Sequence, residues 1–478
     1  MQPSNRLPYW YYVWPSAVYA LLTLLCADNS FFWDNIMQAS KAGQWYYNTN
    51  LSTLILPTEL DAGHPPLFGL YLAAVWKLMG QSLAVSHWAI FPLLLGIGWQ
   101  ATRLAALVSP DRKWVVLITA FLLADTALLA QASQVSPDLA LTFFALWAVA
   151  NILTHSRREW LAISLLGLVM VSTRGILLGF GIGLAELIIL VFIEKAPNTQ
   201  TLLKRLGAYI PAILLVLAWL WWHYHQTGWV GYNPASQWSA NYERVGVAGF
   251  FRNIIIMKAR LLELGRVATW LVMTLAAVVW WRKRVLLPLI SLKIFAFLVG
   301  IMVVLAIFML PYANPIGHRY LILPALMASL LAMQLLLFLW EDGTQRRWIY
   351  RGALLVLLSG HLWIYPAGVA MGWDSTLAHI PYFGYRKQAV AHLKAYQIPA
   401  GTVGSDFPNL ASFWDTDLMQ EPYFFKEKNL KKDDFVLESN IMNGFSDEEL
   451  ADLRQHWQVR REWGGWPVYM RLYERKPH

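Results

Sequence analysis

Long apolar runs, separated by short polar segments, fill most of this 478-residue chain. A helix needs about 20 apolar residues to cross the hydrocarbon core of a bilayer. Eleven runs have this character, and we interpret them as membrane spans: 10–26, 84–108, 114–131, 139–153, 160–171, 175–193, 206–222, 263–281, 285–310, 321–340 and 348–365. The pattern therefore predicts an α-helical polytopic membrane protein.

One further apolar stretch, residues 65–80, is shorter and carries Lys77 near its end. If this stretch were a span, every later loop would change sides and the arginine-rich loops would face outward. We therefore interpret it as a helix that lies in the outer interface or re-enters there.

The cationic residues give the spans a direction. With a cytoplasmic N-terminus, the inward segments carry 13 Lys and Arg in 42 residues, whereas the outward segments carry 8 in 117. The inward cations are Arg6, Arg112, Lys113, Arg157, Arg158, Lys195, Lys204, Arg205, Arg282, Lys283, Arg284, Arg346 and Arg347. Because cytoplasmic loops are enriched in Lys and Arg, the bias predicts a cytoplasmic N-terminus and, after eleven spans, an extracytoplasmic C-terminus.

The composition agrees with this pattern and excludes several classes of protein. Hydrophobic residues make up 57% of the chain and charged residues 14%, whereas ordinary soluble domains are about 25% charged. A soluble enzyme, a disordered chain and a fibre are therefore excluded. The net charge of +9 is explained by the inward loops and does not indicate nucleic-acid binding.

Charge density divides the chain near residue 365. Residues 366–478 hold 28 charged residues in 113, which is the frequency of a soluble domain. We predict a transmembrane domain at 1–365 and an extracytoplasmic α+β domain at 366–478. In the second domain we expect helices at 385–396 and 446–455, the latter opening with a Ser446–Glu449 capping box, and strands at 402–405, 434–439 and 468–473.

The N-terminal region and the cysteine content add two constraints. The polar start, 1–9, leads into the first apolar run without a small-residue cleavage pattern, so we expect a retained span rather than a signal peptide. Cys26 is the single cysteine of the sequence, which excludes an internal disulfide and a cysteine metal site.

Two carboxylates stand in outward loops. Asp34 follows the first span among aromatic residues, and Asp138 lies in the Ser-Pro-Asp sequence before the fourth run. Asp34 is either a loop acid or helix N-cap, or a general base at the membrane surface. Asp138 fits the first turn of a helix. The predicted topology places both on one side, where they would share an acceptor hydroxyl or a cation.

Basic residues accompany these acids on the same side. His64, before Pro65 and Pro66, is either a hydrogen-bond donor to an anion or an interfacial histidine. Arg174 in Thr-Arg-Gly and Arg319 in His-Arg-Tyr lie at outer helix boundaries. An arginine there either extends its side chain to the headgroups or holds a phosphate with its planar fork.

Two acids, Asp125 and Glu186, fall inside predicted spans. Buried charges in a membrane indicate function by default, although hydrogen bonds within the bundle also explain Asp125. The sequence lacks a Walker-type loop, a metalloprotease His-Glu motif and a nucleophile elbow. Matched pairs of broken helices are not evident in the sequence, which disfavours secondary transport.

Four sequence features follow one another along the chain. They are an acid after the first span, then Gly-His-Pro-Pro-Leu, then Ser-Pro-Asp-Leu-Ala-Leu-Thr-Phe-Phe, and then Thr-Arg-Gly. This series resembles the membrane glycosyltransferases of the GT-C fold, in the bacterial branch related to the lipid A aminoarabinose transferase and to protein O-mannosyltransferases. The resemblance covers roughly residues 10–340 and implies a GT-C-like bundle. The tail resembles small extracytoplasmic domains of some members.

The resemblance also assigns roles. Asp34 matches the catalytic acid of the first loop and Asp138 the second acidic position. His64 stands where some relatives have lysine. Many relatives have a second acid after the first one, and this chain has Asn35 instead, so a divalent cation at Asp34 and Asp138 stays an open alternative. The expected ligands of the donor phosphate are His64, Arg174, Arg319 and Tyr320.

These roles imply an enzyme of the bacterial plasma (inner) membrane. It would transfer a monosaccharide from a polyprenyl phosphate to a hydroxyl of a lipid, glycan or protein at the outer face, with inversion at the anomeric carbon. Asp34 is the candidate base. Two alternatives are a transporter or flippase of lipid-linked sugars, which would need paired broken helices, and a scaffold whose tail binds a partner.

Overall fold

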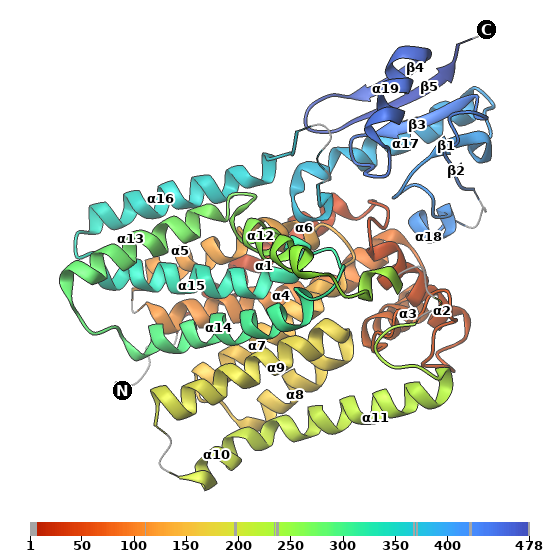
Figure 1. Cartoon of the computed structure of the whole chain (residues 1–478). Coiled ribbons are helices and arrows are strands. Elements are labelled where there is room, and N and C mark those ends of the chain that lie inside the picture. Colours follow the sequence, from red (N-terminus) through yellow and green to blue (C-terminus); the bar gives the residue numbers. More distant parts are fainter. Residues whose placement is uncertain are drawn as a thin grey trace.

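The computed structural model describes residues 7–109, 111–195, 198–233, 235, 239–366, 369, 371–419 and 423–476; Arg6, one of the expected inward cations, lies outside them. A helical bundle forms the larger part of the molecule, and a small sheet lies at one end of it, near the C-terminus (Figure 1). Within these residues, five helices are long and apolar enough to cross a membrane, or up to seven if each of two bent pairs is one span. The chain is thus an integral membrane protein.

The helical part contains the following elements: α1 (Trp10–Cys26), η1 (Ile36–Lys41), α2 (Ala42–Asn48), α3 (Leu67–Met79), α4 (Leu83–Val108), α5 (Arg112–Leu123), α6 (Thr126–Ala132), α7 (Pro137–Leu153), α8 (Arg158–Val171), α9 (Thr173–Ile188), η2 (Ile189–Ile193), α10 (Thr199–Leu206), η3 (Gly207–Tyr209), α11 (Ile210–Thr227), η4 (Ser239–Tyr242), α12 (Val247–Leu262), α13 (Val267–Lys283), α14 (Leu289–Met309), η5 (His318–Leu321), α15 (Ile322–Leu339), α16 (Gly343–Ser359) and η6 (Gly360–Leu362). Helical structure occupies each of the eleven predicted runs, and α3 lies in the stretch assigned to the interface. Eleven spans were expected, whereas five to seven of the described helices are long and apolar enough to cross a membrane, because several of the predicted runs form shorter or bent helices. The central helix is α15, because 83% of the most apolar window of His318–Leu339 is buried.

Two pairs of helices are sharply bent, and the sequence predicted neither bend. α5 and α6 meet at 73°, so the run 114–131 is not one straight span, and α12 and α13 meet at 90°, although α12 was expected to be loop. The second break needs Gly265, whose φ is +79° and whose Cβ position would lie 2.4 Å from the Val356 carbonyl oxygen. Arg266 at this break donates two hydrogen bonds of 2.8 Å to Asp125 at the other. The ion pair balances charge at both interruptions, which explains why they are tolerated inside the bundle.

The C-terminal region adds η7 (Trp373–Ser375), η8 (Leu377–His379), α17 (Pro381–Ala395), η9 (Ala400–Thr402), β1 (Val403–Ser405), α18 (Phe413–Asp417), β2 (Lys426–Glu427), β3 (Phe435–Ser439), α19 (Asp447–His456), β4 (Trp457–Gly464) and β5 (Tyr469–Arg475). Its described part forms a sheet of order β2-β1-β3-β5-β4, with β1 parallel to β2 and β3, and β5 antiparallel to β3 and β4. The expected helices and strands are confirmed, including the Ser446–Glu449 capping box. Sequence reasoning did not find β2 and β4.

The C-terminal region holds the segment that follows α1. The Phe31 amide donates to the Thr416 carbonyl at 2.8 Å. Arg386 of α17 donates to Ser30 at 3.1 Å and to both carboxylate oxygens of Asp417 at 2.9 Å. The loop that carries Asp34 is therefore fixed from two sides, by the bundle and by the C-terminal region.

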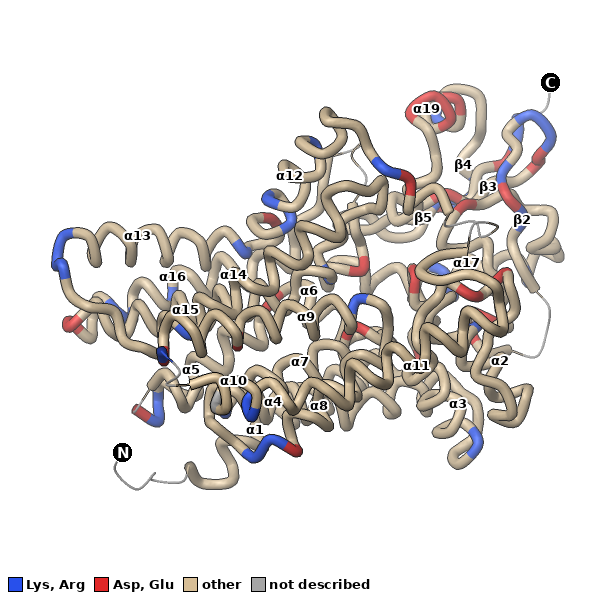
Figure 2. The backbone as a smooth tube through the Cα atoms, turned by 60° about the horizontal axis from the view of Figure 1, so that its bottom comes forward, with Lys and Arg blue, Asp and Glu red and all other residues tan. Residues whose placement is uncertain are grey.

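Figure 2 shows where charge gathers on the backbone. Lys and Arg cluster at the end of the bundle away from the sheet, notably at the turn between α13 and α14 and around α10. This is the arrangement that the positive-inside rule requires if the sheet is outside the cell. The orientation itself stays a prediction.

Candidate active site

Arg319 is the centre of a buried ionic cluster. It lies in η5, which leads into α15, and its side chain is 5% exposed. Each guanidinium nitrogen faces a different carboxylate: Nη2 donates to Asp34, Nη1 donates to Asp374, and Nε lies 3.6 Å from Asp138 Oδ2. One planar fork thus joins three segments that are far apart in the sequence.

Arg174 enters the cluster from the first turn of α9. Its Nη1 donates to Asp138 Oδ1, and its guanidinium carbon lies 4.3 Å from the centre of the Tyr320 ring. Arg319 lies 5.3 Å from the centre of the same ring. Asp138 therefore lies between two guanidinium groups, and Tyr320 presents its π face to both of them.

The beginning of α7 explains why Asp138 points into the cluster. Ser136 is the N-cap, and its hydroxyl accepts a hydrogen bond from the Asp138 amide at 3.2 Å. Pro137 occupies the first helical position, where its missing N–H costs nothing. The predicted helix start is confirmed, and the same acid that favours the helix N-terminus also pairs with both arginines.

His64 lies at the edge of the cluster. Its Nδ1 is 3.0 Å from the hydroxyl of Thr173, the neighbour of Arg174. Burial, reinforced by the Arg174 cation, lowers the pKa of His64 to about 4. The imidazole is therefore neutral at neutral pH and offers a hydrogen-bond donor rather than a positive charge.

The backbone around Asp34 is held by its neighbours. Asn35 donates to the Gln134 side-chain oxygen at 2.8 Å, and Gln134 Nε2 lies 3.4 Å from His379 Nε2. The His379 ring stacks on Phe32 with centroids 4.9 Å apart. These contacts join the first loop, the segment before α7 and the C-terminal region around Asp34.

Asp374 is the functional candidate that sequence reasoning missed. It lies in η7, between α16 and the sheet, and is 4% exposed. Burial and the nearby carboxylates raise its pKa, while the Arg319 cation opposes that shift. The sequence around it, Gly-Trp-Asp-Ser, contains no motif that would have marked it.

The three carboxylates differ in how far they are open to other molecules. The side chain of Asp34 is 27% exposed, compared with 3% for Asp138 and 6% for Asp374. Of the three, Asp34 is the one that an incoming hydroxyl group reaches most easily.

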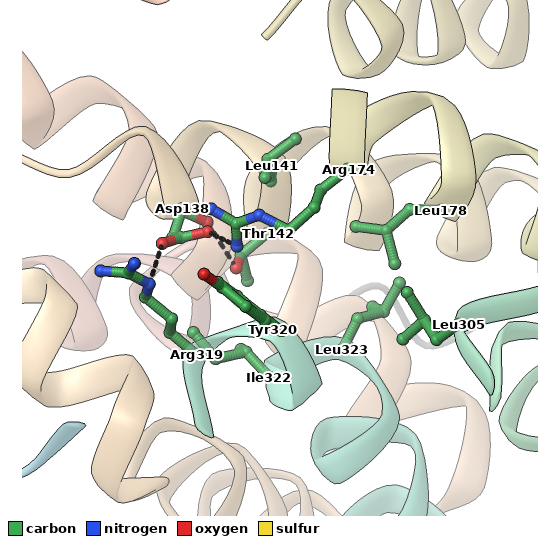
Figure 3. Close-up of a pocket in the computed structure, with 10 residues that line it drawn as sticks. All are labelled: Asp138, Leu141, Thr142, Arg174, Leu178, Leu305, Arg319, Tyr320, Ile322 and Leu323. Carbon is green, nitrogen blue, oxygen red and sulfur yellow. Dashed lines mark hydrogen bonds and ion pairs between the residues drawn. The ribbon is translucent and has the colours of Figure 1, made fainter. Parts of the chain in front are cut away.

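A narrow pocket lies beside the cluster (Figure 3). Asp138, Thr142, Arg174 and Arg319 form its polar lining. Leu178, Leu305 and Leu323 lie together on the side away from these groups, Leu141 and Ile322 lie beside them, and Tyr320 lies in between. The enclosed volume is about 10 Å³, which is room for about one water. A phosphate therefore enters only when the lining side chains move apart.

The expected cation position does not fit these residues well. Asp34 and Asp138 both face Arg319, and Asp138 also pairs with Arg174. Within the described ranges no group of three or more His, Cys, Asp or Glu is placed to hold a metal ion. We therefore derive no step through a metal.

The comparisons with known proteins rest on structure, since no family model and no curated protein sequence matches the chain. The crystal structure of ArnT from Cupriavidus metallidurans bound to undecaprenyl phosphate aligns over 96% of this chain and 97% of its own, with a TM-score of 0.53 and 14% identity. The chain has the GT-C fold. ArnT in the apo state covers the same shares with a TM-score of 0.50 and 13% identity.

Two further acids have partners inside the GT-C bundle. Asp125 caps α6 and pairs with Arg266, as described for the broken helices. Glu186 of α9 accepts hydrogen bonds of 2.9 Å from Arg158 and from Tyr209. Both acids are explained by these contacts and need no direct part in chemistry.

Proposed function

We propose that this GT-C protein transfers a monosaccharide from a polyprenyl-phosphate donor to a hydroxyl acceptor at the outer face of the membrane. The observation that carries the proposal is the cluster of Asp34, Asp138, Arg174 and Arg319 beside a pocket with one apolar wall. The ArnT structure with bound undecaprenyl phosphate, which has the same fold, supports a polyprenyl-linked donor.

The pocket suits the two halves of such a donor. Arg174 and Arg319 offer N–H groups and positive charge to a phosphate, and arginine forks match phosphate geometry. The side chains of Leu178, Leu305 and Leu323, away from the arginine head groups, suit a prenyl chain. The phosphate would carry more negative charge as it leaves, so the two cations would act most strongly in the transition state.

Asp34 is the proposed general base. It is the most exposed of the three carboxylates on Arg319, and a base must reach the proton that it removes. The contacts of Asn35 with Gln134 and of Phe32 with His379 fix the backbone on either side of it. Its carboxylate would therefore be oriented before the acceptor arrives.

The proposed reaction is a single displacement. The acceptor oxygen attacks the anomeric carbon while the bond from that carbon to the phosphate oxygen breaks. The acceptor proton passes to Asp34, and the electron pair of the broken bond stays on the polyprenyl phosphate. Because attack and departure occur on opposite faces of the carbon, the configuration inverts.

The remaining residues would support this step. Asp138 lies between Arg174 and Arg319 and would orient both toward the phosphate. His64, neutral at neutral pH, would donate a hydrogen bond from the nitrogen that does not face Thr173. Tyr320 would hold the guanidinium groups against its ring. The acceptor class, whether lipid, glycan or protein, stays open.

The test uses the purified full chain with a lipid extract of host membranes, which supplies donor and acceptor together. Transfer is followed as release of undecaprenyl phosphate by mass spectrometry. Asp34→Asn keeps the size of the side chain but cannot take the proton, so the rate should fall roughly 10²–10⁴-fold. Asp28→Asn, which changes an exposed acid of the same loop, is the matched control and should keep full activity. A folded Asp34→Asn protein with wild-type turnover would remove Asp34 as the base.

One observation favours a second candidate, a transporter or flippase of lipid-linked sugars. The bent pairs α5–α6 and α12–α13 are the kind of discontinuous helix on which transporters build sites, and the sequence did not reveal them. Here the two breaks pair with each other through Asp125 and Arg266. A flippase moves the lipid-linked sugar without consuming it, so release of undecaprenyl phosphate distinguishes the two functions.

A further inference from the structure

Asp374 is the carboxylate on Arg319 to which the proposed reaction gives no role. Its Oδ2 accepts from Arg319 Nη1, and its Oδ1 accepts from the Ser375 hydroxyl at 3.2 Å. Gln131 Nε2 donates to the Asp374 carbonyl oxygen at 2.7 Å, which ties this part of the C-terminal region to α6. The carboxylate is therefore held in place against Arg319.

Asp374 is joined to the lining of the pocket by its hydrogen bond with Arg319. The residues that line the pocket include Arg319, Asp138 and Arg174, whereas Asp374 bonds to Arg319 and is not among the lining residues. A phosphate in the pocket would meet Arg319 directly. Asp374 then acts on that phosphate through the position and the effective charge of Arg319.

The charges in the cluster determine how the contact between Asp374 and Arg319 affects a bound phosphate. Among the described residues the cluster contains three carboxyl groups, on Asp34, Asp138 and Asp374, and two guanidinium groups, so the formal charges sum to −1. His64 adds no charge at neutral pH, because burial lowers its pKa to about 4. A phosphate that binds here must compete with carboxylates for the N–H groups and the charge of Arg319.

We infer that Asp374 is a positioning residue that orients Arg319 and also limits how tightly Arg319 holds the phosphate, so that the product lipid leaves after transfer. The inference rests on the proposed function. Asparagine at this position separates the two effects. Its side-chain oxygen still accepts from Arg319 Nη1, but it carries no charge.

The probe is undecaprenyl phosphate itself, and its binding to the full chain in lipid nanodiscs is measured by quenching of tryptophan fluorescence. Asp374→Asn should bind about tenfold more tightly than wild type, because one negative charge near the phosphate is removed. In the transfer assay the same variant should lower KM and kcat together, since release of the product becomes slower. Asp374→Ala loses the acceptor as well and should bind less tightly than Asp374→Asn.

Asp433→Asn is the matched control, because Asp433 is 1% exposed and pairs with Lys426 at 2.7 Å within the C-terminal region. It should bind the lipid as wild type does. Equal or weaker binding by a folded Asp374→Asn protein overturns the inference alone. If wild type does not bind undecaprenyl phosphate, or Arg319→Ala binds it unchanged, the proposed function fails, and the inference fails with it.

Discussion

Arg319 makes a set of contacts that a lysine at this position could not make. Its planar fork faces three carboxylates at once, on Asp34, Asp138 and Asp374, whereas an ammonium is a compact point charge without fixed donor directions. The position of Asp34 and the proposed phosphate site therefore depend on one side chain.

Two substitutions of Arg319 distinguish the effect of its positive charge from the effect of its planar fork. We expect Arg319→Lys to lower kcat/KM for the lipid-linked donor about tenfold or more, and Arg319→Ala to lower it about 10²–10³-fold, the range seen when a donor to transition-state charge is removed. Steady-state kinetics with folded proteins checks both. If neither variant changes donor affinity or turnover, Arg319 only anchors its helix at the interface.

Sequence reasoning found the residues that stand out against an apolar background. Asp138 and Arg319 lie at the edges of spans and Asp34 lies in the loop after the first span, where a charge is rare and its side of the membrane follows from the loop count. Asp374 is one of many acids in a region of ordinary soluble composition. Its role comes from the contact with Arg319, and no local pattern reports such a long-range contact.

Glu438 of β3 should make the stability of the folded protein depend on pH. Burial raises its pKa to about 7, while an unfolded glutamate has a pKa near 4.3. The folded state therefore binds this proton more tightly than the unfolded state. Its stabilising effect is complete below the unfolded pKa and is lost as pH rises through about 7. The loss is about 4 kcal/mol at most.

The measurement is hydrogen exchange of peptides from β3, corrected for the intrinsic effect of pH. Protection in wild type should fall between pH 5 and pH 8. Glu438→Gln, which keeps an acceptor for the Tyr469 hydroxyl that donates to Glu438 at 2.9 Å, should remove most of that fall. An unchanged pH profile in the variant would show that other groups cause it.

At the scale of elements, the broken helices are the feature that hydropathy does not reveal. The break between α5 and α6 falls at Ala124-Asp125, within an apolar run that contains no Gly or Pro. Strand β2 has two residues, and polar residues make up half of β4 and do not alternate regularly with apolar ones, so neither gave a strand pattern. Long apolar runs predict helices well, but side-chain contacts with other helices of the bundle determine where a helix bends.

The Asp125–Arg266 pair should be essential to these bends. Both side chains are 3% exposed and form two hydrogen bonds of 2.8 Å. Removal of one partner leaves a buried charge, so Arg266→Ala should destabilise the protein by about 3–5 kcal/mol. The double variant Asp125→Asn with Arg266→Gln leaves no charge and should recover much of that loss. Thermal unfolding in detergent compares them, and an unaffected Arg266→Ala protein would contradict this account.

At the scale of the whole molecule, the site forms where several segments meet at one end of the bundle. The first loop, the starts of α7 and α9, η5 and η7 all contribute side chains to it. The sheet lies at this end and the Lys-rich and Arg-rich turns lie at the other (Figures 1 and 2). The fold class was predictable from the long apolar runs and the order of the motifs, whereas the contact of the C-terminal region with the site was not.

Cysteine labelling tests the predicted orientation of the chain in the membrane. In a Cys26→Ser background, an impermeant maleimide should label Ser52→Cys and Gln455→Cys in spheroplasts, and should label Gln345→Cys only after lysis. All three positions are exposed, so burial does not explain a negative result. Labelling of Gln345→Cys in intact spheroplasts would invert the predicted topology.

In the proposed reaction the chain consumes a polyprenyl-linked sugar, and Asp34 is the base. The most direct measurement is mass spectrometry of the polyprenyl-linked lipids in host cells that carry either the wild-type chain or Asp34→Asn at equal abundance. One species, a monosaccharide on polyprenyl phosphate, should accumulate in the Asp34→Asn cells, and its sugar should disappear from the acceptor. An unchanged lipid-linked sugar pool, with the acceptor still modified, would contradict it.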